Sequence, residues 1–440
     1  MNSHPMDQRT DDSAQTDGGD TMSYHGTTGA RRAGLQLLAL LAAAGLAGGL
    51  TACDSLLEVK LPGDVTEDAL DDPALADILV NSVIADFECA YNNYTFGSAA
   101  HSDEMWQSSG NLVHRNWGQR KITNDFANYV TGTCGAWGYG LWTTMHTARF
   151  QSEDVFERIS GFEGVEEKDL KLATAATYGA FMYTYFGEAF CEVTIDGGAP
   201  MAPQAVLTLA QEKFESALQL AQSSGDATMI NAARVGLARV RLDRGDHQGA
   251  RQAAEPVPEG FLLNATRGSD FSYRENKGRT LYVEERHHSV APGFRDLEWK
   301  GVPDPRVHVT DQGRFGLDGV TELWASDKWP SRDTPIPIAK WAEARLIVAE
   351  SAANTGDEAT AVAIINDLHA RAGLPGYDPA TDGPLSDHII QERSRELFQE
   401  GGHRLNDMLR FGLPFFEGTD HVGGTYGNTT CFPLPLVEAS

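Results

Sequence analysis

The sequence predicts a mostly α-helical protein built from tetratricopeptide-like helical hairpins, with long loops and a few short strands. Apolar residues recur at helical spacing in several long segments. A pattern of small residues occurs twice at identical offsets, once in residues 238–254 and once in residues 349–365. Two further stretches predict loops: 92–140 is rich in Asn, Gly, Ser and Trp, and 255–335 is rich in Pro, Gly, Asp and aromatic residues.

The first predicted helix begins near Asp72-Pro73, because Asp caps helix N-termini and Pro fits the first helical position. Its apolar face consists of Leu79, Val80, Val83, Ile84, Phe87 and Tyr91. Helical patterning returns over 142–159, 169–189 and 208–222.

The repeated pattern predicts two helical hairpins. Ala238, Gly245, Asp246, Ala250 and Ala254 share their spacing with Ala349, Gly356, Asp357, Ala361 and Ile365. Small residues let antiparallel helices approach closely, and Gly-Asp marks the turn between them. The usual aromatic positions of the repeat are not filled, so an ordinary helical hairpin is the alternative for either copy.

Short strands are predicted in the second loop-rich stretch, where Thr280 to Val283 alternates apolar and polar residues. The last helix is predicted from about Pro384 to Phe398, followed by a Gly- and Pro-rich tail from Gly412.

The N-terminal segment predicts export. Arg31 and Arg32 precede an uncharged run, 35–50, and small residues then lead to Cys53. This order is typical of a secretion signal, here residues 1–52, with Met22 as the more natural start. A transmembrane anchor is the alternative, but the run is shorter than the roughly 20 apolar residues that a spanning helix needs.

The net charge excludes nucleic acid as a partner. The chain has 35 Lys and Arg against 62 Asp and Glu, a formal charge of −27. Such a surface repels phosphate backbones.

The cysteines leave their pairing open. Besides Cys53 there are four, Cys89, Cys134, Cys191 and Cys431, which allow three pairings, or stay free thiols. No CxxC motif occurs, so we predict no metal site and no cofactor.

Five segments carry a family resemblance. Leu-Thr-Ala-Cys at 50–53 resembles the bacterial lipobox, in which the cysteine is acylated. The others are YGAFMYTYFG (178–187), WAEARLIVAES (341–351), ERSRELFQEGGHRLNDMLRFG (392–412) and FPLPLVE (432–438). In this order they resemble the SusD/RagB-like family of outer-membrane nutrient-binding lipoproteins. Gly402 and Leu405-Asn406 depart from the family's pattern.

The resemblance implies a lipid anchor at Cys53, a tether over 53–70 and one SusD-like domain over 71–440. It implies a location on the outer membrane, held there by the lipid alone. It also implies a substrate-binding lid over a TonB-dependent transporter barrel, which receives the captured oligosaccharide or peptide. The binding groups of the family often lie in the loops after the first helix.

Aromatic and polar residues of the two loop-rich stretches are the predicted ligand-binding residues. The first stretch supplies Trp106, Arg115, Asn116, Trp117 and Trp137, and the second supplies Tyr273, Tyr282 and Trp299. Aromatic rings stack on the apolar faces of sugars, and polar groups pair with hydroxyls. Core packing is the alternative for each tryptophan, and we assign Trp142 to the core.

Two other functions remain as alternatives. The helical repeats fit a scaffold lipoprotein with only protein partners. A surface glycoside hydrolase needs two carboxylates across a bond, and the acidic and imidazole groups of 284–288 do not supply them if they lie on an extended strand. The charged 392–412 segment is predicted to be structural, with Glu392, Arg395 and Glu396 laddered along one helix and Arg404, Asp407 and Arg410 pairing with it.

Overall fold

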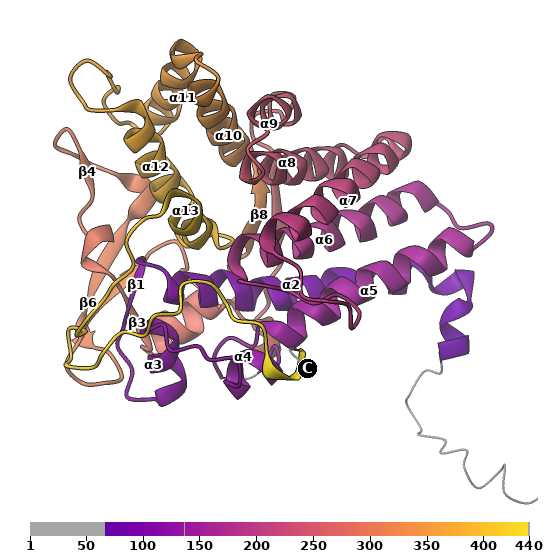
Figure 1. Cartoon of the computed structure of the whole chain (residues 1–440), viewed down its shortest axis with the longest axis horizontal. Coiled ribbons are helices and arrows are strands. Elements are labelled where there is room, and N and C mark those ends of the chain that lie inside the picture. The colour runs from indigo at the N-terminus through magenta and orange to yellow at the C-terminus, as the bar shows by residue number, and fades with distance from the viewer. Residues whose placement is uncertain (1–66, 136, 439–440) are drawn as a thin grey trace, which may run out of the picture. The chain divides into compact units, whose positions relative to one another are not determined.

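The computed structural model describes residues 67–135 and 137–438. Long helices form one half of the described chain and lie side by side (Figure 1). They are α2 (Ala76–His101), α5 (Trp142–Gly161), α6 (Lys168–Ala189) and α7 (Pro203–Ser224). The first of them follows a short turn in which Asp72 caps the backbone N–H of Ala74, as the Asp-Pro pair predicts.

The two repeats form the predicted hairpins. The first is α8 (Ala227–Asp243) with α9 (His247–Ala254), and the second is α10 (Trp341–Asn354) with α11 (Glu358–Arg371). In both turns the aspartate caps the second helix: Asp246 accepts from Gly249 and Asp357 from Thr360. An ion pair of 2.9 Å between Arg251 and Asp357 joins the two hairpins. The predicted mostly helical fold with tetratricopeptide-like hairpins is therefore confirmed.

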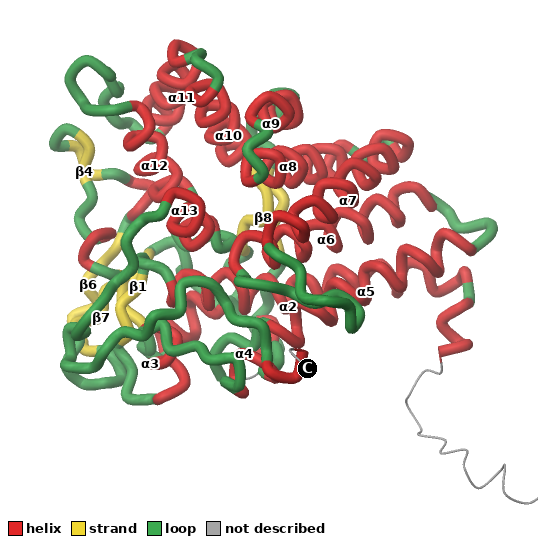
Figure 2. Tube along the Cα trace, in the orientation of Figure 1, coloured by secondary structure: helices red, strands yellow, loops and turns green. Residues whose placement is uncertain are grey.

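The strands are short and pair in twos, all antiparallel. Figure 2 shows most of the strands together with loops, on the side of the described part opposite the long helices. The pairs are β1 (Met105–Gln107) with β3 (His288–Val290), β2 (Leu262–Ala265) with β8 (Ile336–Lys340), β4 (Glu298–Trp299) with β5 (Val302–Pro303), and β6 (Val309–Phe315) with β7 (Glu322–Ser326).

Three predictions of local structure are wrong. The first helix does not end before residue 92 but runs to His101, because its Asn and Ser residues are buried and bonded within the fold. The stretch after it also holds α3 (Leu112–Gly118) and α4 (Ala127–Thr131). Residues 278–284 form a π-helix instead of a strand. The helix predicted to be last, α12 (Leu385–Glu396), is followed by α13 (His403–Phe411).

Two disulfides settle the pairing of four cysteines. Cys89 of α2 is bonded to Cys134, and Cys191 after α6 is bonded to Cys431 near the C-terminus. The first bond fixes a loop of the 92–140 stretch to the longest helix. The second joins the end of the chain to the helical half.

The charged motif of 392–412 is a buried network, with different partners from those predicted. Asp407 bonds both Arg393 and Arg410, each at 2.9 Å, and Arg410 also binds Glu350 of α10 at 2.5 Å. The ladder within α12 does not form, because Glu392 pairs with Arg306 at 2.6 Å. Arg404 leaves the network and binds Asp103 instead.

The predictions for the signal peptide, for Cys53 and for most of the tether fall outside the described residues and stay predictions. The domain limits stay predictions as well. Among residues 67–135 and 137–438, no helix combines the length and apolar character needed to cross a bilayer.

Candidate functional site

Trp117 and Tyr282 lie in the core. The Trp117 indole is fully buried, donates to Asn128 Oδ1 at 2.9 Å and packs edge-on against Tyr139. The Tyr282 hydroxyl donates to the carbonyl of Phe96 from within the π-helix. Since neither ring has an exposed face, we do not carry these two residues into the proposed site.

Trp106 borders a cavity of about 330 Å³, together with Phe294. Residues of both loop-rich stretches therefore meet there. The ring of His421 is stacked 4.2 Å from the Trp106 indole, however, and covers one of its faces. On the wall of the cavity, Arg404 is paired with Asp103. This cavity offers a ligand less open aromatic surface than its composition suggests.

Three predicted residues are half-buried. Trp299 donates its indole N–H to the carbonyl of Pro375 at 2.9 Å. Arg115 and Asn116 lie on α3, and their side chains make no hydrogen bond within the described part of the chain. Trp299 therefore lies against the Pro375 segment, whereas Arg115 and Asn116 lie on α3.

The most exposed aromatic rings of the predicted set are Trp137 and Tyr273. Their exposed fractions are 62% and 48%, and Phe271, stacked 5.4 Å from Tyr273, is 57% exposed. A Cβ placed on Gly135 would lie 3.7 Å from Cβ of Tyr273, so the two loops that carry these rings touch. We call Trp137, Phe271 and Tyr273 the aromatic surface.

The loop that presents Trp137 is held on several sides. The Cys89–Cys134 disulfide anchors its start, Asn128 donates to the carbonyl of Trp137, and Lys277 donates to that of Gly138 at 2.6 Å. Gly138 has φ of 88°, a conformation that favours glycine, and a Cβ there would meet the Asn128 amide. A loop fixed in this way loses little conformational entropy when a ligand binds.

Neutral histidines lie beneath the aromatic surface. The His287 ring is 6.1 Å from the Trp137 indole and is stacked 3.6 Å from His114. Burial, with the nearby Arg286, lowers the pKa of His287 to about 4, and burial lowers the pKa of His288 to about 3. Burial also lowers the pKa of Lys277 to about 7. The histidines of this layer therefore add little positive charge below the rings at neutral pH.

Ser109, His287 and Glu285 form a hydrogen-bonded series in this layer. His287 Nδ1 lies 2.9 Å from Ser109 Oγ, and its Nε2 lies 3.0 Å from Glu285. Ser109 is buried and its Oγ already accepts the backbone N–H of Asn111. A nucleophilic serine must be exposed to its substrate and bonded to a base of suitable pKa. Neither condition is met here.

Glu284 and Glu285 do not act as a pair of catalytic carboxylates. Glu284 is bonded to Arg279 and Arg332, and these cations outweigh partial burial and lower its pKa. Partial burial raises the pKa of Glu285. A glycosidase acid needs an open position beside the bond that it cleaves, whereas Glu284 is already held by two guanidinium groups.

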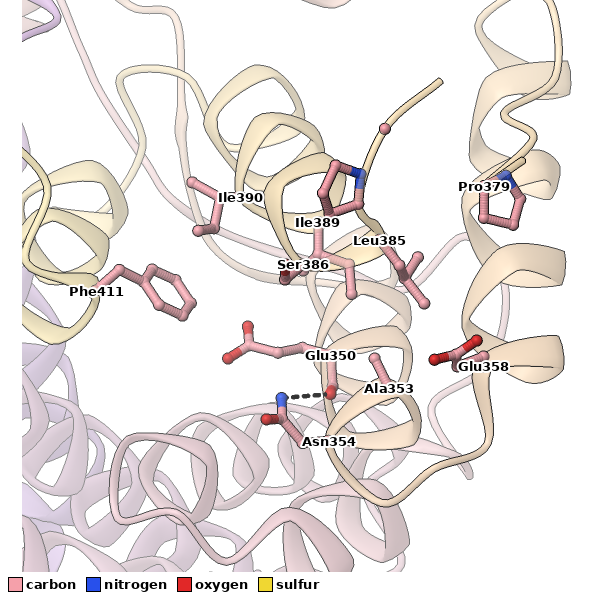
Figure 3. Close-up of a pocket in the computed structure, with 12 residues that line it drawn as sticks. Glu350, Ala353, Asn354, Glu358, Pro379, Leu385, Ser386, Ile389, Ile390 and Phe411 are labelled. Carbon is pink, nitrogen blue, oxygen red and sulfur yellow. Dashed lines mark hydrogen bonds between the residues drawn. The ribbon is translucent and has the colours of Figure 1, made fainter. Parts of the chain in front are cut away.

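A larger groove, about 660 Å³, lies among α10, α11, α12 and Phe411 (Figure 3). Apolar side chains of Leu385 and Ile389 face it, and Asn354 donates to the carbonyl of Glu350 at its floor. Its single aromatic ring, Phe411, makes it less suited to stacking than the aromatic surface.

Comparison with known proteins finds SusD-like relatives. Residues 324–430 match the model of the SusD family. This region resembles the SusD family in sequence, and the chain as a whole resembles SusD-like proteins in fold. The predicted resemblance is thereby confirmed, and the matched region contains α10 to α13 with the buried ion network.

Solved SusD-like structures share the fold across most of both chains. A SusD-like carbohydrate-binding protein from Bacteroides vulgatus is 17% identical, with TM-score 0.61 over 77% of this chain and 83% of that one. A SusD superfamily protein from the same species is 16% identical, with TM-score 0.62 over 84% and 96%. Surface glycan-binding protein A from Bacteroides thetaiotaomicron, in complex with laminarihexaose, is 13% identical, with TM-score 0.61 over 82% and 97%. The chain has no match among curated proteins.

Phe271 is the member of the aromatic surface that sequence reasoning missed. It lies two residues before Tyr273, in a Phe-x-Tyr pattern, where Ser272 begins a short 3-10 turn. Two aromatic residues in a loop of polar residues are a signal that could have been read. Their mutual stacking depends on the turn and is visible only in the structure.

Proposed function

We propose that this SusD-like chain captures an oligosaccharide on the aromatic surface of Trp137, Phe271 and Tyr273. The observation that carries the proposal is the exposure of three aromatic rings, on two touching loops, in a protein with this fold. The sugar rings stack on the aromatic faces through their C–H groups.

Exposed cations near Tyr273 in the chain, or bonded to its neighbours, supply the hydrogen bonds. Arg274 follows Tyr273 directly, has a 45% exposed side chain and donates to Thr266 at 3.0 Å. Arg332 is 48% exposed and binds Glu275 and Glu284. Hydroxyls of a bound sugar replace the water around these groups, so that the polar atoms stay paired in the complex.

A glycan-binding screen on purified residues 54–440 tests the proposal. The panel includes laminarihexaose, because a structural neighbour was solved with it. We expect Trp137→Ala to weaken binding about 30-fold, since truncating a tryptophan anchor costs about 2 kcal/mol and each ~1.4 kcal/mol is tenfold. Isothermal titration calorimetry on the best glycan measures the change.

Phe150→Ala is the matched control. Phe150 is an aromatic residue of α5 with an exposed fraction of 57%, comparable to that of the aromatic surface. The variant should bind as the native protein does. Equal binding by the native protein and Trp137→Ala would contradict the assignment of the site and direct attention to the cavity beside Trp106.

We further propose that the protein is lipidated at Cys53, lies at the outer membrane surface and delivers its ligand to a TonB-dependent transporter. The lipobox-like segment and the SusD-like fold support this. The repeat helices would face the transporter. A peptide remains the second ligand class. The chain needs no catalytic residues for this role.

Replacing Cys53 tests the anchor. In Cys53→Ser the thiol that would carry the acyl chain is absent, so we expect the protein to move from the membrane fraction to the soluble fraction. Fractionation and immunoblotting of the producing cells measure this. Cys53→Ser that stays in the membrane fraction would refute the lipid as the sole anchor.

A further inference from the structure

Three ligating side chains meet in the core between α11 and α12. His388 and Glu392 are four residues apart on α12, so they lie on one helix face, and His369 approaches from α11. All three are buried. One ligand atom from each residue lies within 4.8 Å of the other two.

The hydrogen bonds of His369 require a second proton or a metal ion at its Nε2 atom. Its Nδ1 is 2.7 Å from the carbonyl oxygen of Pro375, and its Nε2 is 2.8 Å from Glu392 Oε1. Both partners are acceptors, whereas a neutral imidazole has one N–H. With Nδ1–H donating to Pro375, either a second proton lies between Nε2 and the carboxylate, or the two groups move slightly apart and share a metal ion.

His388 distinguishes between these two occupants. Its Nε2 lies 3.7 Å from the same Glu392 oxygen, is buried, and has no hydrogen-bond partner within the described residues. A proton on His369 leaves this nitrogen unsatisfied. A metal ion bound to Glu392 Oε1 and both Nε2 atoms satisfies all three groups together.

The surroundings orient the three groups as metal ligands. The Pro375 carbonyl holds His369, and Arg306 donates to both carboxylate oxygens of Glu392, to Oε2 at 2.6 Å and more weakly to Oε1 at 3.2 Å. Ligating histidines and carboxylates commonly have such outer hydrogen bonds. Tyr377 is stacked 4.0 Å from the His388 ring and limits its rotation.

The charge of Arg306 opposes a second cation, but it is shared. Arg306 also binds Asp304 at 2.8 Å, and this carboxylate in turn binds Arg395 at 3.2 Å. The carboxylates of Asp304 and Glu392 therefore balance the two guanidinium groups before any metal enters. The two imidazoles remain as nitrogen donors for the metal.

We propose that His369, His388 and Glu392 form a zinc site that ties α11 to α12. Two imidazoles and a carboxylate suit Zn²⁺, which binds histidine nitrogen at about 2.0–2.1 Å and prefers four tetrahedral ligands. Small shifts bring the three donors to that spacing, and water fills the fourth position. The ion stiffens the start of α12, whose Leu385 and Ile389 line the groove of Figure 3.

Zinc titration of the purified protein tests the proposal. Residues 54–440 are treated with chelator, dialysed and titrated with ZnCl2 by calorimetry, and then with Co²⁺ while visible absorption is recorded. We expect one zinc per chain, the strong absorption bands of tetrahedral cobalt and a higher Tm with zinc. No stoichiometric zinc binding by the native protein would overturn the site.

His388→Gln is the decisive variant. It removes one ligand but leaves the Arg306–Glu392 ion pair and the His369 bonds in place, so it should fold, and circular dichroism checks this. We expect it to lose the tetrahedral cobalt bands and the rise in Tm. His308→Gln is the control, because His308 has a 68% exposed side chain and contacts Asp327 instead. If His388→Gln binds zinc as well as the control does, these residues are not the ligands.

Discussion

Asp407→Ala is expected to lower the free energy of unfolding by about 3–5 kcal/mol, the usual cost of removing one partner from a buried ion pair. Asp407 is buried and accepts hydrogen bonds from Arg393 and Arg410. Without it, Arg393 keeps only a 3.7 Å contact with Glu350, so a buried guanidinium loses its main counter-charge. Urea unfolding at pH 7 measures the loss.

Glu212→Ala is the control for this prediction. Glu212 is an exposed carboxylate of α7 and has no ion pair within the described residues, so its removal should change the stability by less than about 0.5 kcal/mol. Similar losses of unfolding free energy in Asp407→Ala and Glu212→Ala would show that the buried ion network stabilises the protein no more than an exposed carboxylate does.

The Asp407 effect should also depend on pH. Burial opposes ionisation of Asp407, but Arg393 and Arg410 outweigh it and hold the pKa of this carboxyl below its usual value. A depressed folded-state pKa stabilises the protein above the unfolded-state value, about 4, and this contribution is lost as the pH falls through the folded-state pKa. The difference between native protein and Asp407→Ala should therefore shrink below about pH 4.

Removing the Cys191–Cys431 disulfide is the second large effect that we expect. The bond closes a loop of 240 residues, and the chain-entropy model gives roughly 5 kcal/mol for a loop of this length. The double variant Cys191→Ser and Cys431→Ser should lose about 2–5 kcal/mol, the usual range for native disulfides. Urea unfolding of the native protein and of the double variant, both under oxidising conditions, measures this loss of stability.

The chain end should stay docked in that variant. Phe432 is buried, exchanges backbone hydrogen bonds with Ala189 and Cys191, and packs against Phe190 and Tyr129. Hydrogen exchange should therefore show Phe432 as well protected as the rest of the core, up to the limit set by the lower global stability. Protection lost at the tail alone, with unchanged unfolding, would contradict a global role for the bond.

The Cys89–Cys134 pair provides the matched comparison. It closes a shorter loop, with a separation of 45 residues, so its removal should cost less stability. Because Cys134 anchors the loop of Trp137, the same change should weaken glycan binding. Removing the Cys191–Cys431 bond should thus cost more stability, whereas removing the Cys89–Cys134 bond should cost more glycan affinity.

Much of the helical architecture could be predicted, because it depends on periodicity along the chain. The hairpin turns illustrate this: Gly-Asp at 245–246 and 356–357 has a local reason to end one helix and cap the next. Residues 92–101 could not be predicted as helix from local preference, since buried hydrogen bonds such as that of Asn93 to the Gly140 carbonyl satisfy their polar groups. Tertiary contacts there override the low helix propensity of Asn and Ser.

The candidate site was predictable in composition only. Trp117 and Trp137 both belong to the Trp-rich 92–140 stretch, but one faces the core from α3 and the other stands in solvent on a loop held by a disulfide. His369 and Glu392 are 23 residues apart and gave no metal-binding pattern. Their proximity arises only when α11 packs beside α12.

The sequence by itself determined the helix-rich class, the repeated hairpins and the family resemblance, because these reside in local spacing and short motifs. Only the tertiary structure decided the cysteine pairing, the partners of each charge in 392–412, and which aromatic rings remain exposed. Those properties depend on which distant segments touch, and burial then fixes whether a side chain is a ligand platform, an ion-pair partner or part of the core.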